Sequence, residues 1–447
     1  MSNILLINSI IREFAPPNNI PLGVCYLSSV LKQAGHNVDI CDLNGLRQIN
    51  PDREYWLSQY KRKYDFIGLS GLIVTYGEQR RYLDYITEHK REFGNPVIIT
   101  GGGLASSVPV FAHRNMLEID IYAMGEGEHT ILDIVNGKEW GSISGIAYNY
   151  DFGRELRFNK SRELIKDLDK IPYPDWESIP VDKVYLKNPI WGGLAGNSSK
   201  IPYLAKRSMN MIVSRGCPNS CSFCYHYVFG KKYRLRSVAN VIGEIMELKN
   251  RFDIDFVGFV DDNTTANRAW VLDFCNQMIE KFNGDIKWGC SARVNQVDKE
   301  VLEAMKSAGC EWIGFGIESG SPEILQRMNK KATPEMASKA IKLTREAGIW
   351  ANTTFIAGYL GETKETLRQS ARFMKENDCL NSMFYANPYP ETQLYEEAKD
   401  KIIDKYGSED SYIKSLADAT ELKVNLSQLS DQDLVKYRNL AMSGQEF

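Results

Sequence analysis

The sequence predicts an α/β protein made of a Rossmann-like doubly wound parallel sheet, a partial (β/α)6 TIM-like barrel and a mostly helical C-terminal segment. Short apolar runs alternate with amphipathic helical stretches over residues 1–140 and again over residues 207–385, which is the pattern of parallel βα units. With 447 residues, the chain is also too long for one ordinary hydrophobic core. We expect residues 141–206 to link the two domains and residues 386–447 to form the C-terminal segment.

The composition indicates a globular enzyme. Hydrophobic residues make up 43% of the chain and charged residues 25%, and the formal net charge is -3. This balance gives no reason to expect nucleic acid as a partner. No apolar run approaches the length of a membrane span, and the N-terminus lacks the basic region and cleavage site of a signal peptide. We therefore expect a cytoplasmic protein with no membrane span.

Strands and helices alternate over residues 1–140. The stretches 22–34 and 76–91 have helical apolar spacing, and Gly35 closes the first of them. The runs that fit strands are residues 3–8, 36–41, 66–70, 97–100 and 120–123. These elements predict a parallel sheet with helices on both faces, in which ligands bind beyond the carboxyl ends of the strands.

Small and polar residues follow those strand ends. They are Ser70, Gly71 and Thr75 after the third strand, Gly101, Gly102 and Gly103 after the fourth, and Gly125 and Glu126 after the fifth. Consecutive glycines allow a ligand to approach the backbone closely, although a tight turn explains a glycine-rich loop equally well. Glu126 precedes an expected helix, where the helix dipole favours a carboxylate with or without a cofactor.

The linking segment combines a hairpin with irregular stretches. Residues 145–150 and 155–158 fit a β-hairpin, and prolines stiffen residues 169–176. Residues 188–203 are rich in Gly, Ser, Asn and Pro and show no periodicity. Their position makes them a candidate active-site cover.

The second domain repeats strand and helix in about six βα units, so we expect its active site at the carboxyl ends of the strands. Expected strands are residues 209–214, 256–260, 287–291, 312–316 and 350–356, and expected helices are residues 238–252, 267–282, 299–308, 334–347 and 365–376. A further helix is expected over residues 427–441.

Three cysteines, Cys217, Cys221 and Cys224, lie within eight residues on the loop that leaves the first barrel strand. Clustered thiolates suit a soft-metal centre, and an iron-sulfur cluster takes cysteine ligands, usually four. A zinc site normally shows two C-x-x-C or C/H pairs, and His226 lies only two residues past Cys224. The spacing favours an iron-sulfur cluster with one open iron over zinc or buried apolar cysteines.

The other six of the nine cysteines stand alone in the sequence. Most of them are expected to be small buried apolar residues. Cys290 and Cys310 remain weak candidates for an auxiliary site, since each lies beside a predicted barrel strand.

The motif Cys217-x3-Cys221-x-Phe223-Cys224 resembles the signature of radical S-adenosylmethionine (SAM) enzymes. The resemblance implies a 4Fe-4S cluster on the three cysteines, with the methionyl amine and carboxylate of SAM chelating the open iron. One electron, supplied by a donor such as flavodoxin or ferredoxin, would cleave SAM to a 5'-deoxyadenosyl radical. That radical would then abstract a hydrogen atom from the substrate.

The resemblance also implies a SAM-binding set around the barrel. The backbone around Tyr225 and His226 would meet the adenine. Candidates for the amino, ribose and carboxylate groups are Asp261, Ser291, Arg293 and Glu318, and Phe223 and Asn352 are further cofactor-binding candidates. The structural alternatives are helix caps for Asp262 and Ser319 and a surface salt bridge for Arg293.

The glycine-bearing strand ends of residues 1–140, together with residues 21–27, resemble the cobalamin-binding domain that precedes the radical domain in a large subfamily of these enzymes. The resemblance implies that Ser70, Thr75, the glycines and Glu126 contact cobalamin. The chain has no D-x-H-x-x-G signature, which fits a subfamily that holds the corrinoid without a histidine ligand. Some relatives keep the domain as a scaffold without the cofactor.

Two chemistries follow from this resemblance. In the first, methylcobalamin made from one SAM gives its methyl group to a carbon radical generated by a second, and an unactivated carbon is methylated. In the second, no methyl group moves, and the radical drives dehydration, cyclisation or rearrangement, with the N-terminal domain as a scaffold or cobalamin in a non-methyl role. The substrate stays open between a small metabolite, a sugar, a lipid and a peptide.

Overall fold

The computed structural model describes residues 1–151, 155–188, 205–379 and 383–447, which form two compact units. The N-terminal unit comprises Met1–Asn188, Tyr227–Gly230 and Asp410–Leu416, and the C-terminal unit comprises the remainder. Most of the expected linking segment thus belongs to the N-terminal unit. Apart from Asn188, the candidate active-site cover at 188–203 lies outside the described residues.

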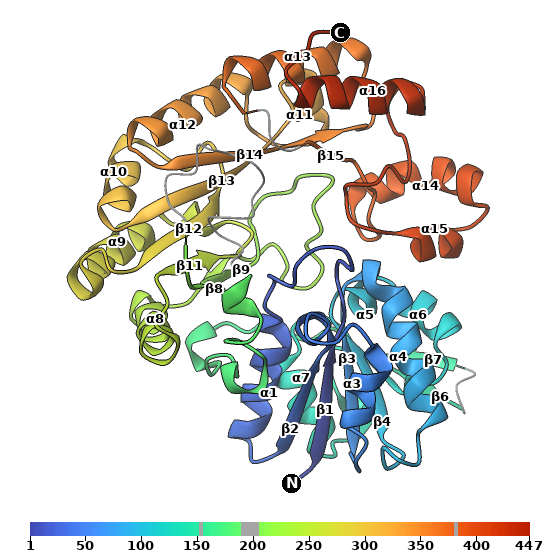
Figure 1. The fold of residues 1–447 in the computed structure, drawn as a ribbon. Helices are drawn as coiled ribbons and strands as arrows, with labels where there is room; N and C mark the ends of the chain where they lie inside the picture. The colour runs from blue at the N-terminus through green and yellow to red at the C-terminus, as the bar shows by residue number, and fades with distance from the viewer. Residues whose placement is uncertain (152–154, 189–204, 380–382) are drawn as a thin grey trace. The chain divides into compact units, whose positions relative to one another are not determined.

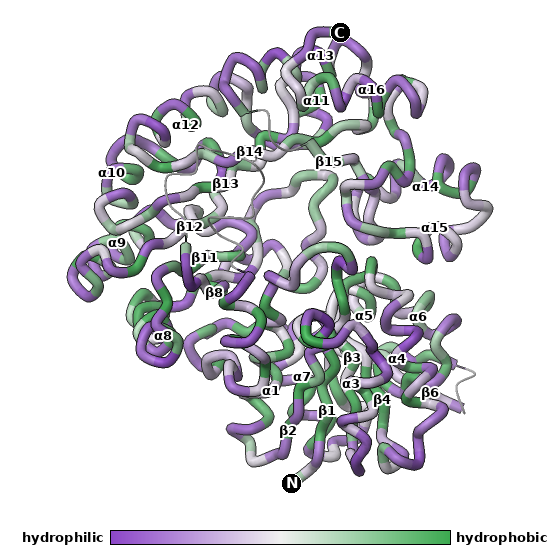
Figure 2. The backbone as a smooth tube through the Cα atoms, viewed as in Figure 1, coloured by the Kyte–Doolittle hydropathy of each residue, from purple (hydrophilic) through white to green (hydrophobic). Residues whose placement is uncertain are grey.

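The N-terminal unit is built on a seven-stranded sheet in the order β2-β1-β3-β4-β5-β6-β7 (Figure 1). The first five strands are parallel: β1 (Asn3–Asn8), β2 (Asn37–Asp42), β3 (Phe66–Ser70), β4 (Val97–Gly101) and β5 (Ile121–Ala123). Five of the six residues of β1 are buried, and β1, β3 and β4 are hydrophobic along most of their length (Figure 2). Continuous apolar runs are typical of parallel strands covered on both faces.

Helices connect these strands as the sequence predicts. They are α1 (Leu22–Gln33), α2 (Leu43–Leu46), α3 (Arg53–Gln59), α4 (Tyr76–Glu88), α5 (Gly103–Ser107), α6 (Pro109–Asn115) and α7 (Glu128–Val135). Helix α1 ends before Gly35, whose φ of 85° is the left-handed conformation that favours glycine at a helix C-terminus.

The predicted hairpin forms, but it extends the sheet instead of lying in a separate connector. Strand β6 (Ile146–Tyr150) pairs antiparallel with β5, and β7 (Glu155–Phe158) pairs antiparallel with β6. The reason is that Ile146 and Ala147 are buried apolar residues, which need a neighbouring strand on which to pack. The sheet is therefore mixed and not wholly parallel.

The C-terminal unit is a partial barrel of six parallel strands in the order β15-β14-β13-β12-β11-β8. Their bounds are β8 (Ser208–Met211), β11 (Phe256–Phe259), β12 (Lys287–Ala292), β13 (Cys310–Glu318), β14 (Trp350–Ala357) and β15 (Met383–Tyr385). The helices that follow the strands are α8 (Val238–Phe252), α9 (Arg268–Phe282), α10 (Lys299–Ser307), α11 (Pro322–Arg327), α12 (Pro334–Glu346) and α13 (Lys364–Glu376) (Figure 1). Strand β15 has only three residues, too few to show a pattern in the sequence.

The predicted first barrel strand, residues 209–214, is broken in two. Strand β8 ends at Met211, and β9 (Ser214–Arg215) turns away to pair antiparallel with β10 (Arg234–Leu235). The buried Asp261 carboxylate accepts hydrogen bonds from the Val213 amide (2.8 Å) and the Ser214 hydroxyl (3.1 Å). These bonds redirect the chain just before the cysteine loop.

The C-terminal helices are α14 (Gln393–Tyr406), α15 (Glu409–Ser415) and α16 (Asp431–Met442). Helix α16 starts later than the expected 427 because the side chain of Ser430 caps it by accepting from the Asp433 amide. Among the described residues, no helix combines the length and the apolar character needed to cross a membrane.

Alternation along the barrel strands separates a core face from a face that lines the barrel interior. On β13, Ile313, Phe315 and Ile317 are buried, whereas Trp312, Gly314 and Gly316 are only partly covered. Strand β14 repeats this alternation, with the same partial cover at Asn352 and Thr354. These partly covered residues of β13 and β14 line a cavity beside the three cysteines.

Candidate active site

The three cysteines lie on a loop that is fastened to the barrel through its middle residue, Ser222. The Ser222 amide donates to the Met328 carbonyl (3.0 Å), and the Ser222 carbonyl accepts from the Leu394 amide (2.9 Å). The Ser222 hydroxyl lies 2.5 Å from the Tyr359 hydroxyl and donates to the Arg327 carbonyl. Because buried polar groups are costly to leave unpaired, these bonds hold the loop in one conformation.

The thiols of this loop differ in exposure. Cys217 and Cys221 are buried and Cys224 is exposed. Asn219 Nδ2 lies 3.4 Å from Cys217 Sγ, and Arg293 Nη1 lies 3.5 Å from Cys221 Sγ. In the described part of the chain, no three His, Cys, Asp or Glu side chains are arranged to hold a single metal ion. A zinc site places its donors around one ion, whereas a 4Fe-4S cluster takes each thiolate on a different iron. Three thiols that line one cavity match the second donor set.

A cavity of about 290 Å³ adjoins the thiols at the carboxyl ends of the barrel strands. It brings together the three cysteines and nearly all the SAM-binding candidates that the sequence analysis names in this domain. Those candidates are Phe223, Tyr225, His226, Ser291, Arg293, Glu318 and Asn352. Asp261 does not line the cavity, since its carboxylate is turned to Val213 and Ser214, whereas its neighbour Asp262 does line it.

A buried ion pair lies in the wall of the cavity. Lys330 Nζ donates to Glu318 Oε1 at 2.8 Å, and both side chains are largely buried. Glu318 follows a bulge in the pairing of β13 with β14 and has a φ of 70°, which a residue other than glycine rarely adopts. Bulges re-aim side chains beside active sites. Strain of this kind persists where the surrounding structure enforces it, so the bulge directs Glu318 to the cavity.

Two glycines of β13 make room for this arrangement. A methyl group added at Gly316 would lie 2.3 Å from Glu318 Oε1 and 3.1 Å from Lys330 Nζ. A methyl group at Gly314 would lie 2.7 Å from the indole ring of Trp312. At these glycines the backbone of β13 is exposed to the cavity, between polar and aromatic side chains. A small polar ligand such as SAM fits this chemistry.

The structural alternatives for three candidates do not occur. Arg293 is buried, so it forms no surface salt bridge. Helix α9 is capped by Asn267 and not by Asp262. The Ser319 hydroxyl contacts the Ser370 hydroxyl and accepts from the Ser321 amide, and Ser321 occupies the N-cap of α11. Asp262 and Arg293 line the cavity, whereas the Ser319 hydroxyl is engaged in the turn before α11.

Cys290 and Cys310 do not line the cavity. Both are fully buried, and burial raises the pKa of each thiol because the thiolate is poorly solvated there. Their surroundings are those of small apolar core residues.

Sequence reasoning missed Ser222, Lys330 and Trp312. Lys330 lies in an Asn-Lys-Lys run that is typical of an exposed turn, yet its side chain is buried beside Glu318. Ser222 separates two cysteines and has no motif of its own. A signal for Trp312 was available, because it shares the strand face of Gly314 and Gly316.

In the N-terminal unit, the strand order 2-1-3-4-5 has its switch point between β1 and β3, where open α/β sheets bind ligands. Ser9 follows β1 there, and its buried hydroxyl has no hydrogen-bond partner among the described residues. Ser70 ends β3 at the same edge, and its carbonyl accepts from the Ser9 amide (3.2 Å). A buried hydroxyl without a partner at this edge fits a ligand that supplies one.

The glycines of this edge serve two purposes. A methyl group at Gly102 would lie 2.8 Å from the Gly71 carbonyl, and one at Gly71 would lie 2.2 Å from Thr75 Oγ1. Gly71 and Gly102 therefore allow two loops to pack together. Gly125 differs from them, because an added methyl group there would meet nothing within 4 Å. Gly101 and Gly103 meet only ordinary contacts.

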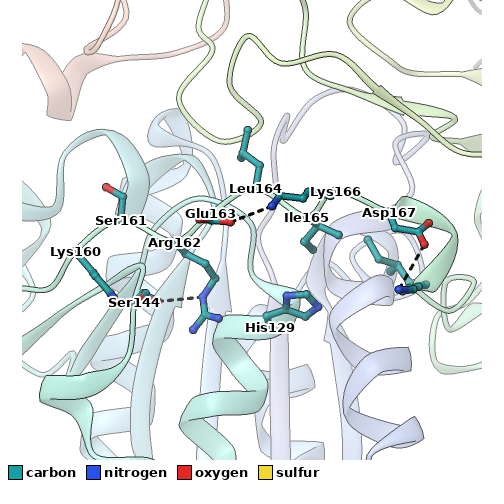
Figure 3. A pocket seen from close by; sticks show the side chains of 12 residues that line it. His129, Ser144, Lys160, Ser161, Arg162, Glu163, Leu164, Ile165, Lys166 and Asp167 are labelled. Atoms are coloured by element: carbon teal, nitrogen blue, oxygen red, sulfur yellow. Dashed lines mark hydrogen bonds and ion pairs between the residues drawn. The ribbon is translucent and has the colours of Figure 1, made fainter.

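A second cavity, of about 640 Å³, lies wholly within the N-terminal unit (Figure 3). His129 projects from the first turn of α7 toward the segment that carries Arg162 and Ile165 (Figure 3). The Glu126 carboxylate accepts from the Ile165 amide at 2.7 Å. Glu126 therefore fastens this segment to the loop between β5 and α7.

Glu362 supports the cysteine loop indirectly, through the turn that carries Tyr359. It is fully buried between β14 and α13, and its carboxylate accepts from the Gly358 amide at 2.6 Å. This bond orders the turn that presents Tyr359 to Ser222. Burial raises the pKa of Glu362 to about 8 because the carboxylate is poorly solvated there.

We expect the stability of the C-terminal unit to fall between pH 5 and 8 and Glu362→Gln to remove part of that fall. In this range the Glu362 carboxyl is ionised in the unfolded chain and protonated in the folded one, so the folded state binds more protons and loses stability as pH rises. By pH 7.5 the variant should be more stable than wild type by up to roughly 3 kcal/mol. Urea unfolding at pH 5 and 7.5 measures the difference. Glu365→Gln, at an exposed position, is the control, and parallel pH profiles for wild type and Glu362→Gln would contradict the assignment.

Models of two protein families match the chain. The Radical SAM superfamily model matches residues 211–374, and the B12 binding domain model matches residues 10–135. The first covers the cysteine loop and most of the barrel, and the second covers the sheet edge described above.

Relatives and solved structures extend over both units. The chain is 31% identical to an uncharacterized methyltransferase of Pyrococcus horikoshii over 87% of this chain and 81% of the relative. It is 28% identical to the anaerobic magnesium-protoporphyrin IX monomethyl ester cyclase of Rubrivivax gelatinosus over 95% of this chain and 74% of the relative. Its fold is similar to that of the radical SAM methyltransferase TsrM from Kitasatospora setae, with a TM-score of 0.69, 19% identity, and coverage of 90% of this chain and 76% of that one.

Proposed function

Because the chain belongs to the radical SAM enzymes that carry a B12-binding domain, we propose that it is a cobalamin-dependent methyltransferase acting on an unactivated carbon. The observation that carries the proposal is the cavity that joins the three cysteines to the Glu318 and Lys330 pair. The cofactors of this family are a 4Fe-4S cluster, SAM and cobalamin. A bound cluster supplies one electron to the sulfonium of SAM, and a bound cobalamin supplies a methyl carrier.

We assign the residues of the C-terminal unit as follows. Cys217, Cys221 and Cys224 hold the cluster. Glu318 and Lys330 offer opposite charges to the amine and carboxylate of the methionyl group, as charge-assisted hydrogen bonds require. Trp312 forms part of the cavity wall. Ser291, Asn352 and Thr354 offer polar groups to the ribose, and the chain at Tyr225 and His226 offers a surface to adenine.

The N-terminal sheet edge is our candidate cobalamin site. Support comes from the unpartnered Ser9 hydroxyl and from the open space at Gly125. The loops after β1, β3, β4 and β5 contain no histidine, so we propose that the chain holds cobalt without an imidazole ligand. Ser70, Gly101, Gly103 and Glu126 border the same edge.

A second candidate function is supported by the cyclase relative from Rubrivivax gelatinosus. In that case the radical would drive ring closure or rearrangement, and no methyl group would be transferred. The substrate in either case is a small molecule, a lipid or a peptide, and the reductant is a flavodoxin or ferredoxin. We propose a cytoplasmic location.

Anaerobic reconstitution with iron, sulfide and hydroxocobalamin tests the proposal. After desalting, we expect about four iron and one cobalt per chain. Incubation with reductant and methyl-labelled SAM should then yield S-adenosylhomocysteine as well as 5'-deoxyadenosine. Four iron without cobalt, and 5'-deoxyadenosine without S-adenosylhomocysteine, would contradict methyl transfer and favour the rearrangement. Nitrogen hyperfine coupling from the protein in the Co(II) EPR spectrum would contradict the absence of an imidazole ligand.

A further inference from the structure

Two of the three thiols accept a hydrogen bond from a nitrogen-bearing side chain. Asn219 Nδ2 donates to Cys217 Sγ (3.4 Å), and Arg293 Nη1 donates to Cys221 Sγ (3.5 Å). The two donors differ in charge, since the amide is neutral and the guanidinium is cationic. Hydrogen bonds from charged donors are roughly twice as strong as neutral ones.

Arg293 is held where it is by a second bond. Its Nη2 donates to the carbonyl of Lys330, the residue whose ammonium group is paired with Glu318. The guanidinium is therefore fixed between the cysteine loop and the segment after α11. It has little freedom to leave the thiol without breaking a buried hydrogen bond.

Arg293 is also a buried cation whose contacts in the described part of the chain are not to a carboxylate. Its residue exposure is 9%, and its guanidinium donates to the Cys221 thiol and to the Lys330 carbonyl. Its Nε has no hydrogen-bond partner there. Burying an unpaired charge is expensive, so this position fits a site where negative charge accumulates on sulfur.

We propose that Arg293, with Asn219 as a weaker neutral partner, sets the reduction potential of the iron-sulfur cluster. The inference rests on the proposed function, because it presupposes a cluster on these thiols. The external donor loses one electron and the cluster gains it, which adds negative charge that is shared by the thiolates. Hydrogen bonds to the sulfurs stabilise the reduced state more than the oxidised one and so raise the potential. Arg293 is in this sense a positioning and tuning residue, distinct from the groups that bind SAM.

Redox titration of the reconstituted protein, followed by EPR and without SAM, tests this proposal. At the wild-type midpoint, Arg293→Gln should show a ratio of reduced to oxidised cluster that is about tenfold lower, equivalent to a midpoint about 59 mV more negative for one electron. Asn219→Ala should shift the midpoint in the same direction by less. Arg293→Lys, which keeps the charge but cannot make both bonds, should fall between Arg293→Gln and wild type.

Lys331→Gln is the matched control. It removes an exposed positive charge next to Lys330 without touching a thiol, and its midpoint should equal that of wild type. The inference would be overturned if Arg293→Lys and Asn219→Ala kept their full iron content and had the same midpoint as wild type. This test remains available even if Arg293→Gln does not retain iron. Weaker SAM binding by Arg293→Gln with an unchanged midpoint would likewise assign Arg293 to SAM. Failure of wild type to hold a reducible cluster would instead refute the proposed function.

Discussion

Cys221→Ala is expected to abolish the formation of 5'-deoxyadenosine from SAM. Cys221 is the buried middle member of the three cysteines and is bonded to Arg293. Removing its thiol leaves two protein ligands for a cluster that needs three, so one iron loses its anchor and the cluster is lost or degraded. Iron content, the visible spectrum and chromatography of 5'-deoxyadenosine after anaerobic incubation with dithionite measure the effect.

Cys290→Ala is the matched control for that experiment. Cys290 is buried on β12 and does not line the cavity, so its replacement should leave the iron content and the product unchanged. Retained 5'-deoxyadenosine in Cys221→Ala would show that the cluster assignment is wrong. About eight iron per chain in wild type, falling to about four in Cys290→Ala, would reveal an auxiliary cluster.

The cysteine motif and the order of strands and helices were predictable because each is a local pattern. The three thiols that are close in the sequence also lie together in the structure, where all three line one cavity. The apolar runs of β1 and β4 are buried along most of their length, as expected. The family resemblance that follows from the motif is confirmed by the two family models.

What escaped prediction depends on contacts between distant segments or on the direction of a single side chain. Of two adjacent aspartates after β11, Asp262 lines the cavity and Asp261 redirects the cysteine loop, and only the path of the chain decides which does which. The sequence indicates that Lys330 is a surface residue. In the structure, the bulge in β13 places Glu318 beside it, and the two side chains form a buried ion pair. The role of Ser222 arises from segments that lie more than 100 residues away.

Gly316→Ala is expected to weaken SAM binding by about tenfold to a hundredfold while leaving the cluster in place. The added methyl group would lie 2.3 Å from Glu318 Oε1 and 3.1 Å from Lys330 Nζ, so the ion pair in the cavity wall must move. These atoms are the ends of flexible side chains, and the φ of Gly316 is not in the left-handed region, so the fold should persist. Displacing charged hydrogen-bonding groups costs about 1.5–3 kcal/mol, which corresponds to the expected loss of affinity.

Equilibrium dialysis of labelled SAM against the reconstituted protein, together with an iron count, measures this effect. Gly77→Ala is the control, because an added methyl group there meets nothing within 4 Å, and its affinity for SAM should match that of wild type. The iron count matters because the cysteines are fastened through Ser222 and not through β13. If Gly316→Ala binds SAM as wild type does, the Glu318 and Lys330 pair does not contact SAM. If iron is lost as well, the pair supports the cluster through Lys330 and Arg293, and binding of SAM must be assigned to other residues of the cavity.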